Sequence, residues 1–129
     1  MALKDMLEIA VVDDTAVSRG LLVNALEEIG IRHIEIFKNG EEALDHLKKR
    51  PRHLVISDQN MPKLDGLGLL EGLRGYEPTS KMGFVLVTGK SDATLIERGR
   101  KFHMNNYLEK PIDAPKMKKC IEDIVGSLD

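Results

Sequence analysis

The chain has 129 residues, of which 42% are hydrophobic and 31% are charged, with 19 Lys and Arg against 21 Asp and Glu. A chain of this size and composition is typical of one globular domain around a single hydrophobic core, which argues against a disordered chain. A formal charge of −2, with both signs interleaved along the chain, argues against a nucleic-acid-binding protein, because such proteins usually carry a basic excess.

The first part of the chain predicts two strands, each followed by a helix. Residues 8–12 form a compact apolar run, and residues 17–29 then place apolar side chains at helical spacing. Gly30 stands where a left-handed residue would end this helix. A second strand is predicted at residues 34–37, and Asn39 can cap the helix that follows it.

The middle of the chain repeats this unit. Residues 53–57 predict a strand that runs into Asp58, and a turn with Gly66 separates it from a short helix at residues 67–73. Residues 75–81 are rich in turn-forming types, so we expect an exposed loop there.

The last part of the chain predicts two more strand and helix pairs. Residues 84–87 and 106–108 are the strands, and Asp92 can open the helix between them. A final helix is predicted over residues 117–128, with Cys120 on its apolar stripe as a buried structural thiol. Five strands alternating with helices predict a parallel sheet that is covered on both faces.

Cysteine content and hydropathy restrict the environment of the protein. One cysteine excludes an internal disulfide and a zinc site built from several thiolates, and it fits a reducing compartment. The longest apolar runs have about five residues, whereas roughly 20 are needed to cross a bilayer. Residues 1–6 also lack the apolar core of a signal peptide. We therefore expect a cytoplasmic protein without membrane contact.

Polar side chains follow the predicted strands at their carboxyl ends. Asp13 and Asp14 follow the first strand, Asp58 the third, Thr88 the fourth and Lys110 the fifth. The carboxyl ends of parallel strands share one edge of a sheet, where ligand sites gather. Three neighbouring carboxylates repel one another and need a compensating cation, for which Mg²⁺ is the natural candidate because it prefers carboxylate, water and phosphate oxygens. The pattern predicts phosphate chemistry.

Each of these residues also has an ordinary structural interpretation. Asp14 and Thr88 could cap helices, Asp58 could begin a turn, and Lys110 could be a solvated residue before a proline. These interpretations explain the residues one at a time but not their joint arrangement.

The ordered set of motifs resembles that of response-regulator receiver domains, in particular the single-domain chemotaxis regulators of the CheY type. The motifs are Asp13-Asp14, Asp58 within residues 57–62, Asp65-Gly66, Thr88 and Lys110-Pro111. The resemblance covers about residues 7–128. It implies a doubly wound, flavodoxin-like α/β fold with strand order 2-1-3-4-5, and one receiver domain over residues 1–129 with no effector domain.

The resemblance assigns a phosphoryl-transfer role to the acidic residues. Asp58 would take a phosphoryl group from a phosphohistidine on a histidine kinase of the chemotaxis type. Asp13, Asp14, Asp58 and the backbone carbonyl of Asn60 would hold Mg²⁺. Lys110 and Thr88 would contact the phosphoryl oxygens. The chain would then be a signalling phospho-acceptor that promotes its own phosphotransfer and autodephosphorylation, rather than an enzyme acting on other substrates.

The resemblance also predicts a switch. The Lys110-Pro111 bond would be cis and would aim Lys110 inward, and Tyr107 would turn inward once Thr88 engages the phosphoryl group. Asn60 and Lys90 would flank the path of hydrolytic water, which gives the hypothesis that Lys90 prolongs the phosphorylated state. A Lys90 that points into solvent would have little influence.

The expected partners follow from the same resemblance. Without an effector domain, a monomer would signal through a protein such as the flagellar motor switch protein. The alternative is a phosphate sink, or a shuttle to another phosphotransfer protein. A small Mg²⁺-dependent phosphatase of the haloacid dehalogenase type is more remote, because its signature is Asp-x-Asp whereas Asp13 and Asp14 are adjacent. An FMN carrier is disfavoured because the acidic loop would repel the cofactor phosphate.

Overall fold

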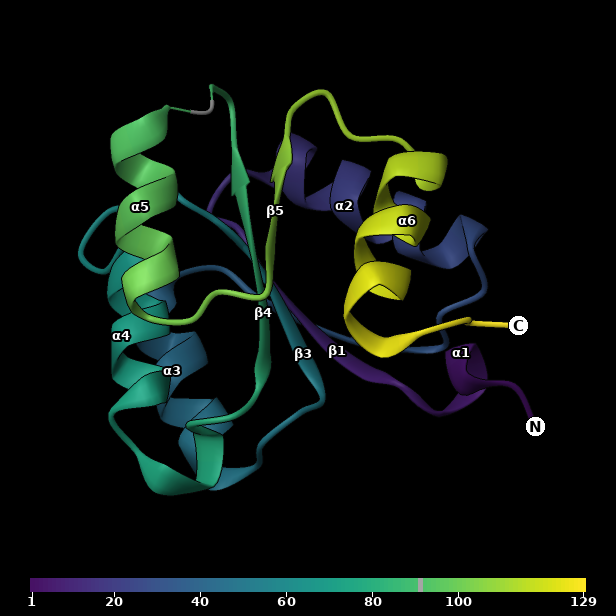
Figure 1. Ribbon diagram of the computed structural model, residues 1–129, viewed down its shortest axis with the longest axis horizontal. Helices are drawn as coiled ribbons and strands as arrows, with labels where there is room; N and C mark the ends of the chain where they lie inside the picture. Colours follow the sequence, from purple (N-terminus) through teal and green to yellow (C-terminus); the bar gives the residue numbers. More distant parts are fainter. Residues whose placement is uncertain (91) are drawn as a thin grey trace.

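The computed structural model describes residues 1–90 and 92–129, and it has a five-stranded parallel sheet at its centre (Figure 1). The strands are β1 (Glu8–Val12), β2 (His33–Phe37), β3 (Leu54–Asp58), β4 (Gly83–Thr88) and β5 (Asn106–Glu109). Their order is β2-β1-β3-β4-β5. The predicted fold class, a doubly wound α/β sheet with this order, is confirmed.

Helices cover both faces of the sheet (Figure 1). One face carries α2 (Ala16–Glu28) and α6 (Ala114–Val125). The other face carries α3 (Gly40–Lys49), α4 (Gly66–Arg74) and α5 (Ala93–Lys101). Two short elements complete the fold, namely α1 (Leu3–Met6) and the 3₁₀ helix η1 (Glu77–Thr79). No helix within residues 1–90 or 92–129 is long and apolar enough to span a bilayer.

The two faces of the sheet bury separate hydrophobic clusters. On β1, Ile9 and Val11 belong to the cluster beneath α2 and α6, whereas Ala10 and Val12 belong to the cluster beneath α3 and α4. All four side chains are fully buried. A strand that is buried on both sides reads as a continuous apolar run, which is why the sequence pattern located β1 without alternation.

Side chains predicted as helix boundaries have the expected contacts. Asn39 accepts a hydrogen bond from the backbone N–H of Glu42, and Asp92 accepts one from that of Leu95. Both contacts satisfy amides that lack a partner in the first helical turn. Gly30 has a φ of +93°, the left-handed conformation predicted for the residue that ends α2.

The C-terminal segment differs from the predicted helix. Helix α6 ends at Val125, and Gly126, with a φ of +90°, turns the chain back. Leu128 is nevertheless fully buried, because this turn returns it to the core. Its carbonyl accepts a hydrogen bond of 3.1 Å from the backbone N–H of Lys4. Lys4 lies in α1, a one-turn helix that the sequence pattern did not predict.

Most of the segment 75–81 is exposed as predicted, with Thr79 as the buried exception. The segment contains η1, and the side chain of Thr79 is fully buried. The Thr79 hydroxyl donates to the carbonyl of Leu73 at 2.7 Å. This contact satisfies an acceptor near the end of α4, so the threonine turns inward although its neighbours are polar.

Arg74, the last residue of α4, joins three segments through backbone carbonyls. Its guanidinium donates to the carbonyls of Met82 at 2.8 Å, Phe102 at 3.0 Å and His103 at 3.0 Å. Burial lowers the pKa of Arg74. His103 has a positive φ of 57° in the turn between α5 and β5. Arg74 therefore ties this turn to the body of the α3–α4 face.

We predict that Cys120 is unreactive in the folded protein. The side chain belongs to the core beneath α2 and α6, and burial raises the pKa of its thiol to about 12. At pH 8 the reactive thiolate is therefore scarce, and reaction with a disulfide reagent should be slower by at least about 100-fold than in unfolded chains. Stopped-flow absorbance with and without urea measures both rates. Comparable rates in the two states would contradict the buried assignment.

Candidate functional site

Three carboxylates gather at the carboxyl edge of the sheet. Asp13 and Asp14 follow β1, and Asp58 ends the adjacent strand β3. One carboxylate oxygen of each residue lies within 4.8 Å of the others. Asp13 and Asp58 are buried, whereas Asp14 is exposed. The pairing of β1 with β3 therefore brings three negative charges together. Water can screen the exposed carboxylate of Asp14 but not the two buried ones.

Lys110, the residue after the edge strand β5, places a positive charge beside these carboxylates. Its ammonium lies 3.2 Å from Oδ1 of Asp58. Its backbone N–H donates to the carbonyl of Thr88, and the Lys110-Pro111 bond is cis. Burial raises the pKa of Asp58, Lys110 opposes this shift, and Asp13 and Asp14 add to it. Desolvation is the largest of these effects, so the carboxyl of Asp58 is more basic than an ordinary aspartate.

Asp13 is held by donors from the start of α2. The backbone N–H of Thr15 donates to Oδ1 at 2.9 Å, and the hydroxyl of Ser18 donates to Oδ2 at 2.5 Å. The Arg19 guanidinium donates to the backbone carbonyl of Asp13 instead. The sequence analysis missed Ser18 and Arg19, although a hydroxyl five residues after a buried aspartate is a signal that could have pointed to the first of them.

Gln59 and Gly66 shape the loop after β3. The Gln59 side chain accepts a hydrogen bond from the N–H of Leu67 and donates to Asp65. A Cβ at Gly66 would lie 2.7 Å from the backbone oxygen of Asp58, so only glycine lets α4 approach this closely. Asn60 follows Gln59 at an exposed position. The packed start of α4 thus fixes the end of β3, where Asp58 lies.

Thr88 ends β4, Lys90 lies two residues beyond it, and Tyr107 lies on β5. The buried Thr88 hydroxyl donates to the carbonyl of Lys90 at 3.0 Å and accepts from its N–H at 3.2 Å. Lys90 itself is exposed. Tyr107 is 37% exposed on the edge strand β5, so its ring is not turned into the core. The structure therefore brings Asp13, Asp14, Asp58 and Lys110 together, and the Thr88 hydroxyl has hydrogen bonds to the backbone of Lys90.

The donor set fits a small divalent cation. Three carboxylates offer hard oxygen ligands of the type that Mg²⁺ prefers, and their charge exceeds that of the Lys110 ammonium. An exposed Asp14 leaves this side open to water and to a phosphoryl group. The residues present therefore suit Mg²⁺ better than a metal that prefers sulfur or nitrogen ligands.

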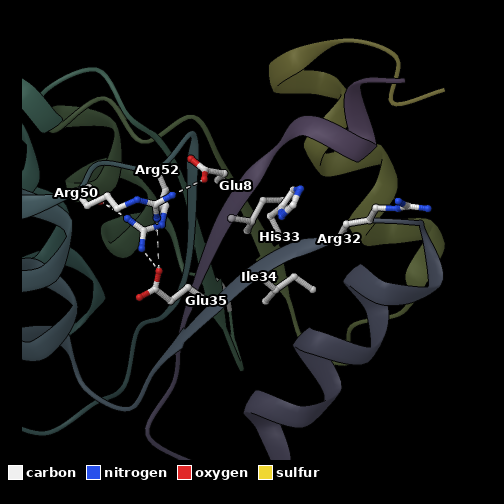
Figure 2. Close-up of a pocket in the computed structure, with 8 residues that line it drawn as sticks. Glu8, Arg32, His33, Ile34, Glu35, Arg50 and Arg52 are labelled. Atoms are coloured by element: carbon white, nitrogen blue, oxygen red, sulfur yellow. Dashed lines mark hydrogen bonds and ion pairs between the residues drawn. The ribbon is translucent and has the colours of Figure 1, made fainter. Parts of the chain in front are cut away.

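A charged pocket lies at the other end of β1, where the strand begins (Figure 2). Arg50 pairs with Glu8 at 2.6 Å, and the largely buried Arg52 pairs with Glu35. The hydrogen bond from Arg50 lowers the pKa of Glu8. Because these guanidinium groups already have carboxylate partners, we interpret the pocket as an ion-pair network that joins β1, β2 and the loop before β3.

Comparison with known proteins places these features in a family. A family model described as the response regulator receiver domain matches residues 9–122. The chain is 38% identical over 128 residues to a probable chemotaxis protein CheY of Rhizobium etli, covering 99% of both chains. It is 30% identical over 122 residues to a chemotaxis protein CheY homolog of Campylobacter jejuni, covering 94% of both.

Solved structures show the same fold at lower identity. Chemotaxis protein CheY4 of Vibrio cholerae superposes with a TM-score of 0.84 at 22% identity, covering 92% of this chain and 98% of that one. The receiver domain of a sensor histidine kinase of Pseudomonas aeruginosa gives a TM-score of 0.83 at 22% identity, covering 94% and 98%. That structure has a magnesium ion coordinated in its active site cleft.

We predict that Asp58→Asn stabilises the metal-free protein at pH 7. The raised pKa of Asp58 means that folding disfavours its ionised form, so the wild type loses stability as pH rises from the ordinary pKa of 3.8 through the folded value. The amide removes this loss, and the gain should vanish at a pH below 3.8.

Urea unfolding in chelator at pH 7 and pH 3.5 measures the difference. Asp45→Asn, which changes an exposed carboxylate on α3, is the control and should have little effect at either pH. An Asp58→Asn variant that is less stable than the wild type at pH 7 would contradict the prediction.

Proposed function

Because this chain belongs to the family of response-regulator receiver domains, we propose that it receives a phosphoryl group on Asp58 from a histidine kinase and controls chemotaxis. The observation that carries the proposal is the buried Asp58 carboxylate between Lys110, at 3.2 Å, and the two carboxylates that follow β1. The similarity to chemotaxis proteins supports the choice of pathway. We place the protein in the cytoplasm as a monomer.

Asp58 has the properties of a nucleophile in this reaction. One carboxylate oxygen attacks the phosphorus of a phosphohistidine, the P–N bond breaks, and the electron pair returns to the imidazole nitrogen, which takes a proton from water. Burial makes the oxygen more basic, which favours attack, while Lys110 stabilises the ionised form. The Lys110 ammonium also remains close enough to contact the transferred phosphoryl oxygens.

The carboxylates of Asp13, Asp14 and Asp58 and the backbone carbonyl of Asn60 would hold Mg²⁺. When bound, this ion offsets negative charge on the phosphoryl oxygens. Asp13 and Asp14 contribute the charge that attracts it, and the exposure of Asp14 leaves room for the donor protein to approach.

Phosphorylation would change the hydrogen bond of Thr88. A phosphoryl group adds nearly two negative charges beside Asp58 and competes with the carbonyl of Lys90 for the Thr88 hydroxyl. Release of that turn would let Tyr107 move inward and alter the face formed by α5, β5 and α6. The partner on this face would be a flagellar motor switch protein. A sink or shuttle would instead pass the group to another phosphotransfer protein.

We predict that acetyl phosphate with Mg²⁺ places one phosphoryl group on the wild type and none on Asp58→Asn. The amide cannot act as the nucleophile, and the fold should be retained. Intact-protein mass spectrometry followed by peptide mapping measures both results, with Asp45→Asn as a control that should label normally. Undiminished labelling of Asp58→Asn, or phosphate on a histidine or serine, would refute the proposal. Many turnovers through an aspartate after β1 would identify a phosphatase.

We also predict that Lys90 slows autodephosphorylation. A cation beside the path of water can pair with a phosphoryl oxygen and obstruct the water. Exposed charge pairs contribute about 0.2–1 kcal/mol, so Lys90→Ala should lose phosphate faster by up to about fivefold, and Lys90→Glu faster still. Phosphate loss after donor removal gives the rates, with Lys101→Ala, an exposed lysine at the end of α5, as the control. Unchanged or slower phosphate loss would contradict the prediction and would indicate that Asn60 or a partner protein sets the lifetime of the phosphorylated state.

A further inference from the structure

Among the groups that contact Asp13, the Ser18 hydroxyl makes the shortest contact with its carboxylate. Ser18 is the third residue of α2, and its hydroxyl donates to Oδ2 at 2.5 Å. The other oxygen accepts from the N–H of Thr15 at 2.9 Å. Asp13 is fully buried, so these two donors replace hydration that the carboxylate would otherwise have.

The cationic groups near Asp13 make their contacts with other atoms. Its two carboxylate neighbours, Asp14 and Asp58, are negative, and the ammonium of Lys110 pairs with Asp58. The guanidinium of Arg19 donates to the main-chain carbonyl of Asp13, not to its carboxylate. The orientation of this carboxylate therefore depends on a neutral hydroxyl and a backbone amide from the first turn of α2.

We propose that Ser18 is a positioning residue that orients Asp13 for the divalent cation. This inference rests on the proposed Mg²⁺ site. Each carboxylate oxygen has two lone-pair positions, and the hydrogen bonds from Thr15 and Ser18 occupy one on each. The remaining positions stay available to a cation or to its water. Without the hydroxyl, only the hydrogen bond from Thr15 would restrict rotation of the Asp13 carboxylate about its Cβ–Cγ bond.

Two effects of the hydroxyl oppose each other. A hydrogen bond withdraws charge from Oδ2 and weakens it as a ligand, whereas fixing the carboxylate avoids the entropy loss of ordering it upon binding. Loss of an outer contact to a metal ligand usually lowers metal affinity by about 10- to 100-fold, so orientation is the larger effect. For one hydroxyl at a site that is open to water, we expect about a tenfold loss.

Titration of the chelator-treated protein with Mg²⁺ alone, followed by backbone amide chemical shifts, tests this role. Ser18→Ala should bind Mg²⁺ about tenfold more weakly. Ser18→Thr keeps the hydroxyl and should restore the affinity, because its extra methyl can enter the apolar groove that Ser18 lines with Leu21 and Ile112. Leu21→Ala alters the same groove without contacting Asp13 and should bind normally. Asp14→Ala removes a carboxylate and should bind much more weakly than Ser18→Ala.

Unfolding of each variant in chelator separates orientation from stability. If Ser18→Ala is destabilised but binds Mg²⁺ like the wild type, the role is structural and the proposal falls. It also falls if Ser18→Thr binds as weakly as Ser18→Ala. If Asp14→Ala retains full affinity, or the wild type does not bind, both the inference and the proposed metal site fail. Labelling of Asp58 by acetyl phosphate tests phospho-acceptance independently.

Discussion

The repulsion among three carboxylates, held within 4.8 Å of one another, is the constraint on which the rest of the site depends. Parallel pairing of β1 with β3 brings Asp13 and Asp14 to Asp58. The ammonium of Lys110 offsets part of this charge. The site is therefore built with an excess of negative charge in the folded chain. In the proposed reaction, an incoming cation would relieve this repulsion, and transfer of a phosphoryl group would increase it.

Charged side chains are paired at one end of β1, whereas negative charge is in excess at the other end. Where β1 begins, Arg50 and Arg52 pair with Glu8 and Glu35, and the charges cancel within the chain. Where β1 ends, the acidic side chains outnumber the nearby ammonium, and burial raises the pKa of Asp58. Folding therefore disfavours ionised Asp58 at the end where we propose that the chemistry occurs, as expected where a reactive arrangement is held against its own repulsion.

The sequence predicted the strands and the residues at their carboxyl ends because these depend on local signals, whereas the strand order came from the resemblance to receiver domains. Buried parallel strands give continuous apolar runs, and Asn39 and Asp92 are recognisable caps. The predictions failed where a residue acts at a distance. Leu128 kept helical spacing but reaches the core after a turn at Gly126, and Thr79 is buried because its hydroxyl meets the end of α4. The hydrogen bond of Ser18 depends on how α2 meets β1, which periodicity does not describe.

Arg74 has a consequence for how α5 can move. Its guanidinium holds the turn after α5 through the carbonyls of Phe102 and His103 and also holds the carbonyl of Met82 before β4. Within α5 itself, Gly99 is the buried residue, close to this clamped end, and the side chain of Met104 packs over it. A displacement that preserves these contacts is a swing of the helix about its C-terminal end. Under this constraint the pivot would lie far along the helix from Thr88, and a change in the turn at Thr88 would move the near end of the helix most.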